Sequence, residues 1–305
     1  MHRIPLNDIA PLLRLTVQNW QNDRAPRLGA ALAYYMALSL APALVIILAV
    51  TGIAFGAKAA QGRLVWQIQG LVGNEGAKVI QSMIEGAHRS SSGIAATLLG
   101  LVTLFFGATA MVTELRDALN TIWRVPEDTA ASRTRSLFNL AKERLHSFAL
   151  VLGAALFLLM SLVLTTWISA AGKYMNASAR PPRAVVQTAD WVVSFGLITA
   201  LFAFIFKILP DVPLRWSDVG AGAVLTSLLF TGGKYLLGFY LGKAGFADSY
   251  GAAGSLIVLL VWVYYSAQVV YLGAEFTRAY ALRFGSMLAA AQDPARPYAA
   301  TYWRP

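Results

Sequence analysis

The chain has 305 residues, of which 57% are hydrophobic and only 13% are charged, and its mean hydropathy is +0.56. Soluble globular proteins carry roughly 25% charged residues, so this composition excludes an ordinary soluble domain and indicates a surface that largely faces lipid. The formal charge of +10 is then expected from basic loops at lipid headgroups rather than from nucleic-acid binding, and the lack of cysteine excludes disulfides and thiolate chemistry.

The N-terminal segment is basic and amphipathic. Its first 27 residues carry four arginines and no continuous apolar run long enough for a signal peptide, so we expect the segment to be retained. Apolar residues follow helical spacing at Leu6, Ile9, Leu13, Val17 and Trp20. This pattern predicts an amphipathic helix on the membrane surface, with Pro11 as a candidate break.

Six stretches are apolar and long enough to cross about 30 Å of hydrocarbon as helices. Their approximate bounds are 28–55, 93–113, 147–171, 185–208, 219–241 and 255–275. We therefore predict an all-α polytopic membrane protein, in which residues 1–305 form a single integral membrane domain. Its six transmembrane helices are accompanied by short interfacial amphipathic helices, including residues 61–86.

The distribution of Lys and Arg predicts the orientation. If both termini are cytoplasmic, the loops on that side hold sixteen of these residues and the loops on the other side hold eight. The positive-inside rule therefore favours cytoplasmic termini.

Lys234 lies well inside the fifth predicted span, where leucines and phenylalanines flank it. A Lys at the centre of a spanning helix costs about 2.5–3.5 kcal/mol, which the surrounding leucines can offset. The side chain either snorkels towards the membrane edge or lines a cavity and meets an anionic group. We favour the second interpretation.

Two polar faces at helical spacing extend this interpretation. One face of the fifth span carries Ser227, Thr231, Lys234 and Gly238. One face of the sixth span carries Tyr264, Gln268, Tyr271 and Glu275. We expect the two faces to meet each other or a shared wet cavity, with closed interhelical hydrogen bonding as the alternative. The first span adds Tyr34, Tyr35 and Ser39 to this candidate substrate path, and Pro42 predicts a kink there.

Four segments resemble the YihY/BrkB family of bacterial inner-membrane proteins. They are LAYYMALSLAP (32–42), LRDALNTIWRV (115–125), GGKYLLGFY (232–240) and YGAAGSLIVLLVWVYYSAQVVYLGAEFT (250–277), of which the last is the most specific. The residues that we single out in these motifs are Pro42, Asn120, Trp123, Gly238, Tyr250, Gly251 and Gly273. The resemblance implies a multi-pass protein of the inner membrane with six transmembrane helices and cytoplasmic termini.

Some members of that family carry the label ribonuclease BN, and the residues argue against this activity here. A metal-dependent nuclease needs converging His, Asp or Glu side chains, whereas the three histidines lie in three separate segments. No phosphate-binding loop or Ser–His–Asp arrangement is present either. We therefore expect no enzymatic activity, no metal and no cofactor.

The leading hypothesis is a transporter-like protein that moves or hands off a phospholipid or another anionic amphiphile for envelope biogenesis. Its expected partners are membrane lipids and a periplasmic lipid-carrier protein, without nucleic acid. One alternative is a secondary transporter of a small solute or ion that uses Glu275, Asp190 or Asp248. Another is a non-transporting scaffold for an envelope partner. Because glycine-rich helix faces can pack between copies of the chain, the sequence does not decide between a monomer and a homo-oligomer.

Overall fold

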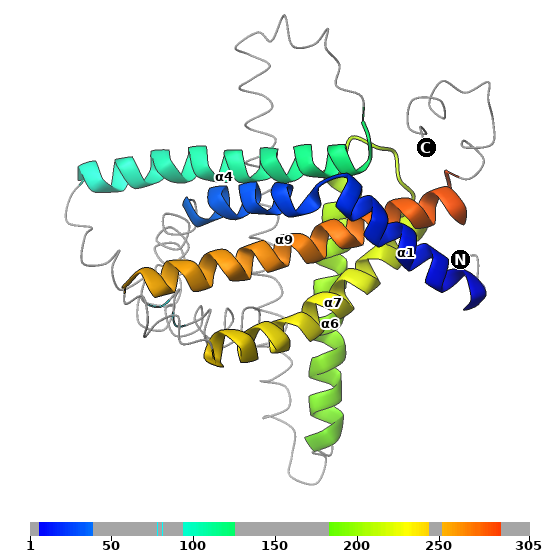
Figure 1. Ribbon diagram of the computed structural model, residues 1–305. Helices are drawn as coiled ribbons and strands as arrows, with labels where there is room; N and C mark the ends of the chain where they lie inside the picture. Colours follow the sequence, from blue (N-terminus) through cyan, green and yellow to red (C-terminus); the bar gives the residue numbers. More distant parts are fainter. Residues whose placement is uncertain are drawn as a thin grey trace, which may run out of the picture.

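The computed structural model describes residues 6–38, 78, 81, 94–125, 183–243 and 252–287, and the regular structure in these residues is helical throughout (Figure 1). The helices are α1 (Leu6–Asn22), α4 (Ile94–Ile122), α6 (Arg183–Ile208), α7 (Trp216–Lys243) and α9 (Ala252–Arg283), and residues 25–38 are also helical. The predicted all-α class is therefore confirmed for the described part of the chain.

Three of the described helices contain stretches that are long and apolar enough to cross a membrane. These stretches are Trp191–Ile208 in α6, Trp216–Leu241 in α7 and Leu256–Arg283 in α9. They correspond to the last three predicted spans. The span at 147–171, residues 39–55 of the first span and most of the segment 61–86 lie outside the described residues, so six transmembrane helices stay a prediction.

Helices α7 and α9 pack against each other in opposite directions through small residues. Gly222 of α7 faces Thr277 of α9, and Gly273 of α9 faces Thr226 of α7, each so closely that an added Cβ would overlap the threonine hydroxyl. Each threonine hydroxyl donates a hydrogen bond to the glycine carbonyl of its own helix, at 2.7 Å in both cases. Because these hydroxyls are satisfied within their helix, the two backbones can approach closely without leaving a buried donor unpaired.

Helix α1 lies across the C-terminal end of α9 (Figure 1). Leu12 is buried in a cluster with Phe276 and Tyr280 of α9, and Arg283 Nη2 lies 2.7 Å from Asp8 Oδ1. The expected break at Pro11 is wrong, because one continuous helix runs through this residue. A proline in the second turn removes one hydrogen bond near the helix start, and tertiary packing on α9 offsets that loss.

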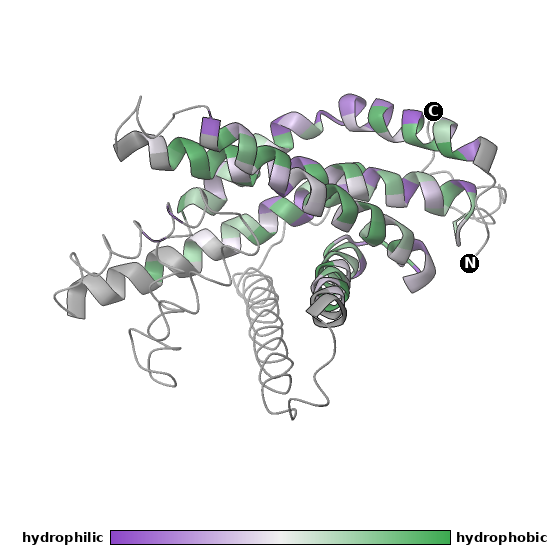
Figure 2. Cartoon of the chain, turned by 90° about the horizontal axis from the view of Figure 1, so that it is seen from below, coloured by the Kyte–Doolittle hydropathy of each residue, from purple (hydrophilic) through white to green (hydrophobic). Residues whose placement is uncertain are grey.

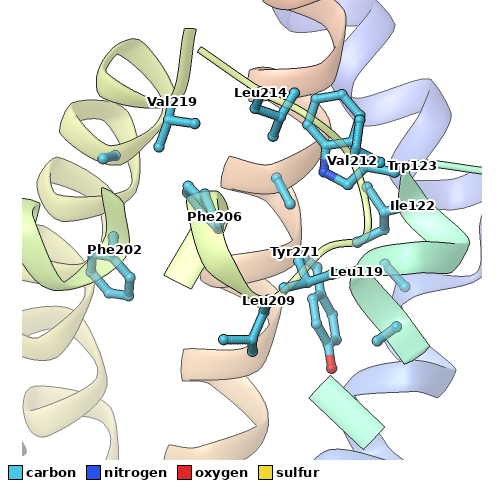
Figure 3. Packing of buried hydrophobic residues seen from close by; sticks show 14 of the residues in the cluster. Leu119, Ile122, Trp123, Phe202, Phe206, Leu209, Val212, Leu214, Val219 and Tyr271 are labelled. Carbon is cyan, nitrogen blue, oxygen red and sulfur yellow. The ribbon is translucent and has the colours of Figure 1, made fainter. Parts of the chain in front are cut away.

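Helix α6 runs steeply across the others. It is seen nearly end-on in Figure 2, where hydrophobic residues cover α6, α7 and α9 more fully than α1. The side chains of Phe202 and Phe206 fasten α6 to the main buried cluster, which also includes residues from α4, α7, α9 and the connector 209–215 (Figure 3). The buried Trp123 closes the α4 end of this cluster.

The connector 209–215 is fixed to α4 by Asn120. Its Nδ2 donates to Asp211 Oδ2 at 2.8 Å, while the Asp211 backbone N–H donates to Asn120 Oδ1 at 2.9 Å. Arg116 also holds this carboxylate with two nitrogens, at 2.5 and 3.1 Å. Asn120 therefore sets the position of the loop that joins α6 to α7.

Candidate functional site

The polar face of α9 is directed towards the N-terminal segment. Gln268 Nε2 lies 3.4 Å from the backbone oxygen of Ala25, and a Cβ added at Gly29 would overlap the Gln268 amide. One and two turns further along α9, Tyr271 and Glu275 are both fully buried. Because α9 is helical through these positions, the 3, 4 spacing of Gln268, Tyr271 and Glu275 puts them on one face of α9.

Glu275 belongs to a buried ionic cluster, which we define as Asp23, Arg124, Glu275 and Arg278. Arg278 Nη1 lies 3.5 Å from Asp23 Oδ2 and 3.8 Å from Glu275 Oε2, and Arg124 Nη2 lies 3.7 Å from Asp23 Oδ1. The Glu275 side chain is 0% exposed and that of Arg278 is 5% exposed. The cluster joins the turn after α1, the end of α4 and α9, and its two acidic and two basic groups balance in formal charge.

The turns that position this cluster have left-handed backbone at two arginines. Arg24, with φ 53°, lies between α1 and helix 25–38, and Arg124, with φ 52°, follows the last turn of α4. A non-glycine residue in this region is uncommon, because its Cβ crowds the following backbone. These two reversals bring the acidic group of Asp23 and the guanidinium of Arg124 to the same place beside α9.

Several buried polar atoms around the cluster make no hydrogen bond. Within the cluster they are Asp23 Oδ2, both carboxyl oxygens of Glu275 and Arg278 Nη1, and beside it they are Trp20 Nε1, Gln268 Oε1 and the Tyr271 hydroxyl. The ion-pair separations of 3.5–3.8 Å are longer than direct hydrogen bonds. The charges therefore attract each other without direct hydrogen bonds, and a buried polar group that makes no hydrogen bond costs about 1–3 kcal/mol.

The hydroxyl group of Tyr271 points from α9 towards α4 (Figure 3). Glu114 of α4 lies within electrostatic range of it. Burial, and secondarily the nearby Asp117, raises the pKa of the Glu114 carboxyl above its ordinary value. Tyr264, at the other end of the predicted α9 face, is exposed and lies outside this group.

The residues on the predicted polar face of α7 differ in burial and in hydrogen bonding. Ser227 is buried and donates to the Ala223 carbonyl of its own helix at 2.8 Å. The hydroxyl of Thr231 is buried and makes no hydrogen bond, and a Cβ added at Gly238 would meet no atom within 4 Å. Lys234 is half-buried, with its Nζ 5.3 Å from the centre of the Tyr235 ring.

Lys234 borders an exposed apolar surface, which we call the α7 outer face. It consists of Tyr235, Leu236, Phe239 and Tyr240, all more than half exposed. At the helix end, Lys243 Nζ lies 4.2 Å from the centre of the Phe239 ring. A cation and an aromatic ring on a lipid-facing surface are features of contacts with lipid headgroups.

The structure separates the two polar faces that we expected to meet. Gly233 contacts Tyr265, so Lys234 lies level with the middle of α9, about ten residues or about 15 Å from Glu275 along the helix axis. The physical reason is that α9 presents its small residues, among them Gly273, to α7, and its polar face lies on the opposite side.

Tyr34 and Tyr35 are the remaining predicted path residues that the structure describes, and they lie outside both groups. Tyr34 is exposed and packs edge-to-face on Tyr35, with the ring centres 5.7 Å apart. Ser39, Pro42, Tyr250, Gly251 and Asp248 lie outside the described residues. Among the residues that the structure does describe, no group of three His, Asp or Glu side chains could hold a metal ion.

Three members of the ionic cluster, Asp23, Arg124 and Arg278, were not predicted from the sequence. Arg278 could have been found, because it follows Glu275 by three residues and helical neighbours at this spacing pair readily. Asp23 and Arg124 carry no comparable local signal, since their partners come from distant parts of the chain.

Comparisons with known proteins place the chain in a family of membrane proteins. The family model for virulence factor BrkB matches residues 16–297. A UPF0761 membrane protein of Verminephrobacter eiseniae is 27% identical over 280 residues, which cover 91% of this chain and 63% of the relative. A second, from Tolumonas auensis, is 29% identical over 182 residues (59% and 56%), and a third, from Vibrio atlanticus, is 27% identical over 273 residues (87% and 81%).

The chain spans about 60% of the length of the first two of these relatives. No solved structure matches it. The family match covers most of the chain, its relatives are membrane proteins, and three of the described helices are able to cross a bilayer. The chain is therefore a membrane protein that belongs to the YihY/BrkB family.

Proposed function

We propose that this protein moves or hands off a phospholipid or another anionic amphiphile in the bacterial inner membrane, with Lys234 as the headgroup contact. The observation that carries the proposal is the half-buried ammonium group of Lys234 on a membrane-capable helix, at the border of the α7 outer face. Both termini are cytoplasmic in this proposal. A periplasmic lipid-carrier protein is the expected acceptor.

The chemistry of the α7 outer face fits such a ligand. A phosphate headgroup supplies the negative charge that offsets the cost of placing Lys234 within a span. The exposed side chains of Leu236 and Phe239 offer apolar contact for acyl chains. The proposed activity breaks no covalent bond, so it requires no catalytic residue, metal or cofactor.

Lys234→Met in reconstituted vesicles tests this role, with movement of labelled phosphatidylglycerol between leaflets as the measurement. Lys243→Met is the matched control, because Lys243 is a cation over an aromatic ring on the same helix but lies at its end. We expect the Lys234 variant to lose most of the movement and the Lys243 variant to keep it. Equal rates in the wild type and the Lys234 variant would refute the proposed role.

The buried carboxyl group of Glu275 favours a second candidate, a secondary transporter of a small solute or ion. A buried acid with two oxygens that make no hydrogen bond is typical of sites that exchange a proton or a cation. This function predicts uptake that depends on a pH gradient, does not require a particular lipid and is lost in Glu275→Gln. Lipid movement that persists without any gradient favours the first candidate.

A further inference from the structure

Helix α1 uses one side for packing and leaves another apolar side exposed. Leu12 and Thr16 are buried, and the Thr16 hydroxyl donates to the Leu12 carbonyl at 2.9 Å. Ile9, Leu13 and Val17 are 38%, 42% and 45% exposed. Since consecutive residues are about 100° apart around a helix, these three residues form one strip beside the packed side. We call this strip the α1 apolar face.

The exposed strip is shorter than the apolar spacing of the sequence predicts. Trp20 continues the same helical spacing, but it is half-buried and packs against the main cluster. The bundle therefore holds α1 through Leu12, Thr16 and Trp20, and the α1 apolar face takes no part in holding the helix in place.

Near α1 the acidic residues are paired and the other charged residues are basic. Asp8 of α1 forms an ion pair with Arg283 at 2.7 Å, and Asp23, just after α1, belongs to the buried ionic cluster. The other charged residues between positions 8 and 27 are Arg14, Arg24 and Arg27, and all three are exposed. Residues 8–27 therefore expose the α1 apolar face together with three arginines, of which Arg14 lies in α1 and Arg24 and Arg27 follow it.

The attachment of α1 sets its position relative to the bilayer. It packs on the last turns of α9, whose membrane-capable stretch ends at Arg283 (Figure 1). A helix fastened at the end of a spanning helix lies at the level of the lipid headgroups. At this level, amphipathic helices bury their apolar side at the boundary between headgroups and acyl chains, and arginines contact anionic lipids.

We propose that the α1 apolar face is a docking surface for the bilayer itself, and that Arg14, Arg24 and Arg27 contact anionic headgroups beside it. The helix thus anchors the N-terminal segment in the lipid interface, while the turn that follows it supplies Asp23 to the buried ionic cluster. This proposal is independent of whether the protein moves lipid.

Single cysteines test the proposal cleanly, because the natural chain has none. Spin labels are placed on the full-length protein at Ile9→Cys, Leu13→Cys and Val17→Cys, with Gln18→Cys and Gln21→Cys as controls on the polar side, both exposed. The protein is reconstituted in vesicles of phosphatidylethanolamine and phosphatidylglycerol. Collision rates with oxygen, which concentrates in lipid, and with a water-soluble nickel chelate are then measured.

We expect labels on the α1 apolar face to collide several-fold more with oxygen than with the nickel chelate, and the control labels to show the reverse. Equal nickel access at all five positions would place this face in water and overturn the proposal. Protection from both reagents, or spin–spin broadening between copies, would instead show that protein covers the face, which also overturns it.

The headgroup contact has its own test. Arg14→Gln combined with Arg27→Gln should raise nickel access at the Leu13 label in vesicles that contain phosphatidylglycerol. In vesicles of phosphatidylcholine alone, the same substitutions should change little. An identical profile with and without the two arginines in the anionic vesicles would exclude their part in the contact.

Discussion

The Thr277 hydroxyl of α9 occupies the space where a side chain at Gly222 of α7 would lie, because a Cβ on Gly222 would overlap it. The relationship is reciprocal, since a Cβ on Gly273 would overlap the hydroxyl of Thr226. Both glycines start a Gly-x-x-x-Thr unit, one in each helix, and the two units pack in opposite directions. The close approach of these membrane-capable helices at this point therefore depends on glycine at both positions.

Gly222→Ala should lower the free energy of unfolding in detergent by about 1–3 kcal/mol, the usual cost of inserting a methyl group into a packed interface. The helices can relieve the overlap only by moving apart or by displacing Thr277. Gly220→Ala is the control, because a Cβ there meets no atom within 4 Å. Equal unfolding midpoints for the two variants would contradict the close approach of α7 and α9.

Arg278→Met should be among the most destabilising substitutions in α9. It leaves the carboxylates of Asp23 and Glu275 without their shared guanidinium, and breaking a buried ion pair typically costs about 3–5 kcal/mol. Arg283→Met removes an exposed pair with Asp8 and should cost no more than about 1 kcal/mol. The two variants carry the same substitution at a buried and at an exposed arginine of one helix. Denaturant unfolding in mixed micelles measures the free energy of unfolding of each.

A second substitution separates charge from packing in the same cluster. If the uncompensated charge causes the loss, adding Glu275→Gln to Arg278→Met should restore part of the stability, because it removes the Glu275 carboxylate that has lost Arg278, whereas Asp23 keeps its ion pair with Arg124. Strictly additive losses in the double variant would assign the effect to lost contacts of the arginine side chain instead.

Much of the helical architecture was predictable from composition and spacing. Apolar stretches of the length of a bilayer predicted the helices at 185–208, 219–241 and 255–275 because, in lipid, a backbone must satisfy its own hydrogen bonds. The continuous helix through Pro11 was not predictable, since its stabilisation comes from contacts with α9 that are distant in sequence.

The candidate site was predictable only along single helices. Helical spacing placed Gln268, Tyr271 and Glu275 on one face of α9, but it could not say what that face contacts. The close packing of α7 on α9, at Gly222 of α7 and Gly273 of α9, decides this, because it turns the polar face of α9 towards Asp23. Lys234 was found because a charge among apolar neighbours is visible in the local sequence. The ionic cluster was not, because it forms only where three distant segments of the chain meet.

Asn120→Ala should loosen the connector 209–215. The substitution removes the donor to the Asp211 carboxylate and the acceptor of the Asp211 backbone N–H, two hydrogen bonds worth about 0.5–1.5 kcal/mol each. Hydrogen exchange of the 209–215 amides should therefore accelerate. Thr121→Ala is the control, because the exposed Thr121 hydroxyl bonds only within α4 at 2.8 Å, and unchanged exchange in both variants would contradict the role of Asn120.

Glu114 provides a prediction for the pH dependence of stability. It lies one residue beyond the second predicted span, where burial, and secondarily Asp117, raises the pKa of its carboxyl above 4.5. The folded protein then binds this proton more tightly than the unfolded chain does, so the contribution is complete below pH 4.5 and is lost as the pH rises through the raised pKa.

Glu114→Gln should therefore raise the unfolding midpoint at neutral pH and leave it unchanged below pH 4.5, because the amide stays neutral at both values. Asp117→Asn removes only the smaller of the two causes, so it should reduce this pH dependence in part. Thermal unfolding in detergent across this pH range measures both effects. A constant difference between the wild type and the Glu114 variant at every pH would show that the substitution acts through packing and not through the carboxyl proton.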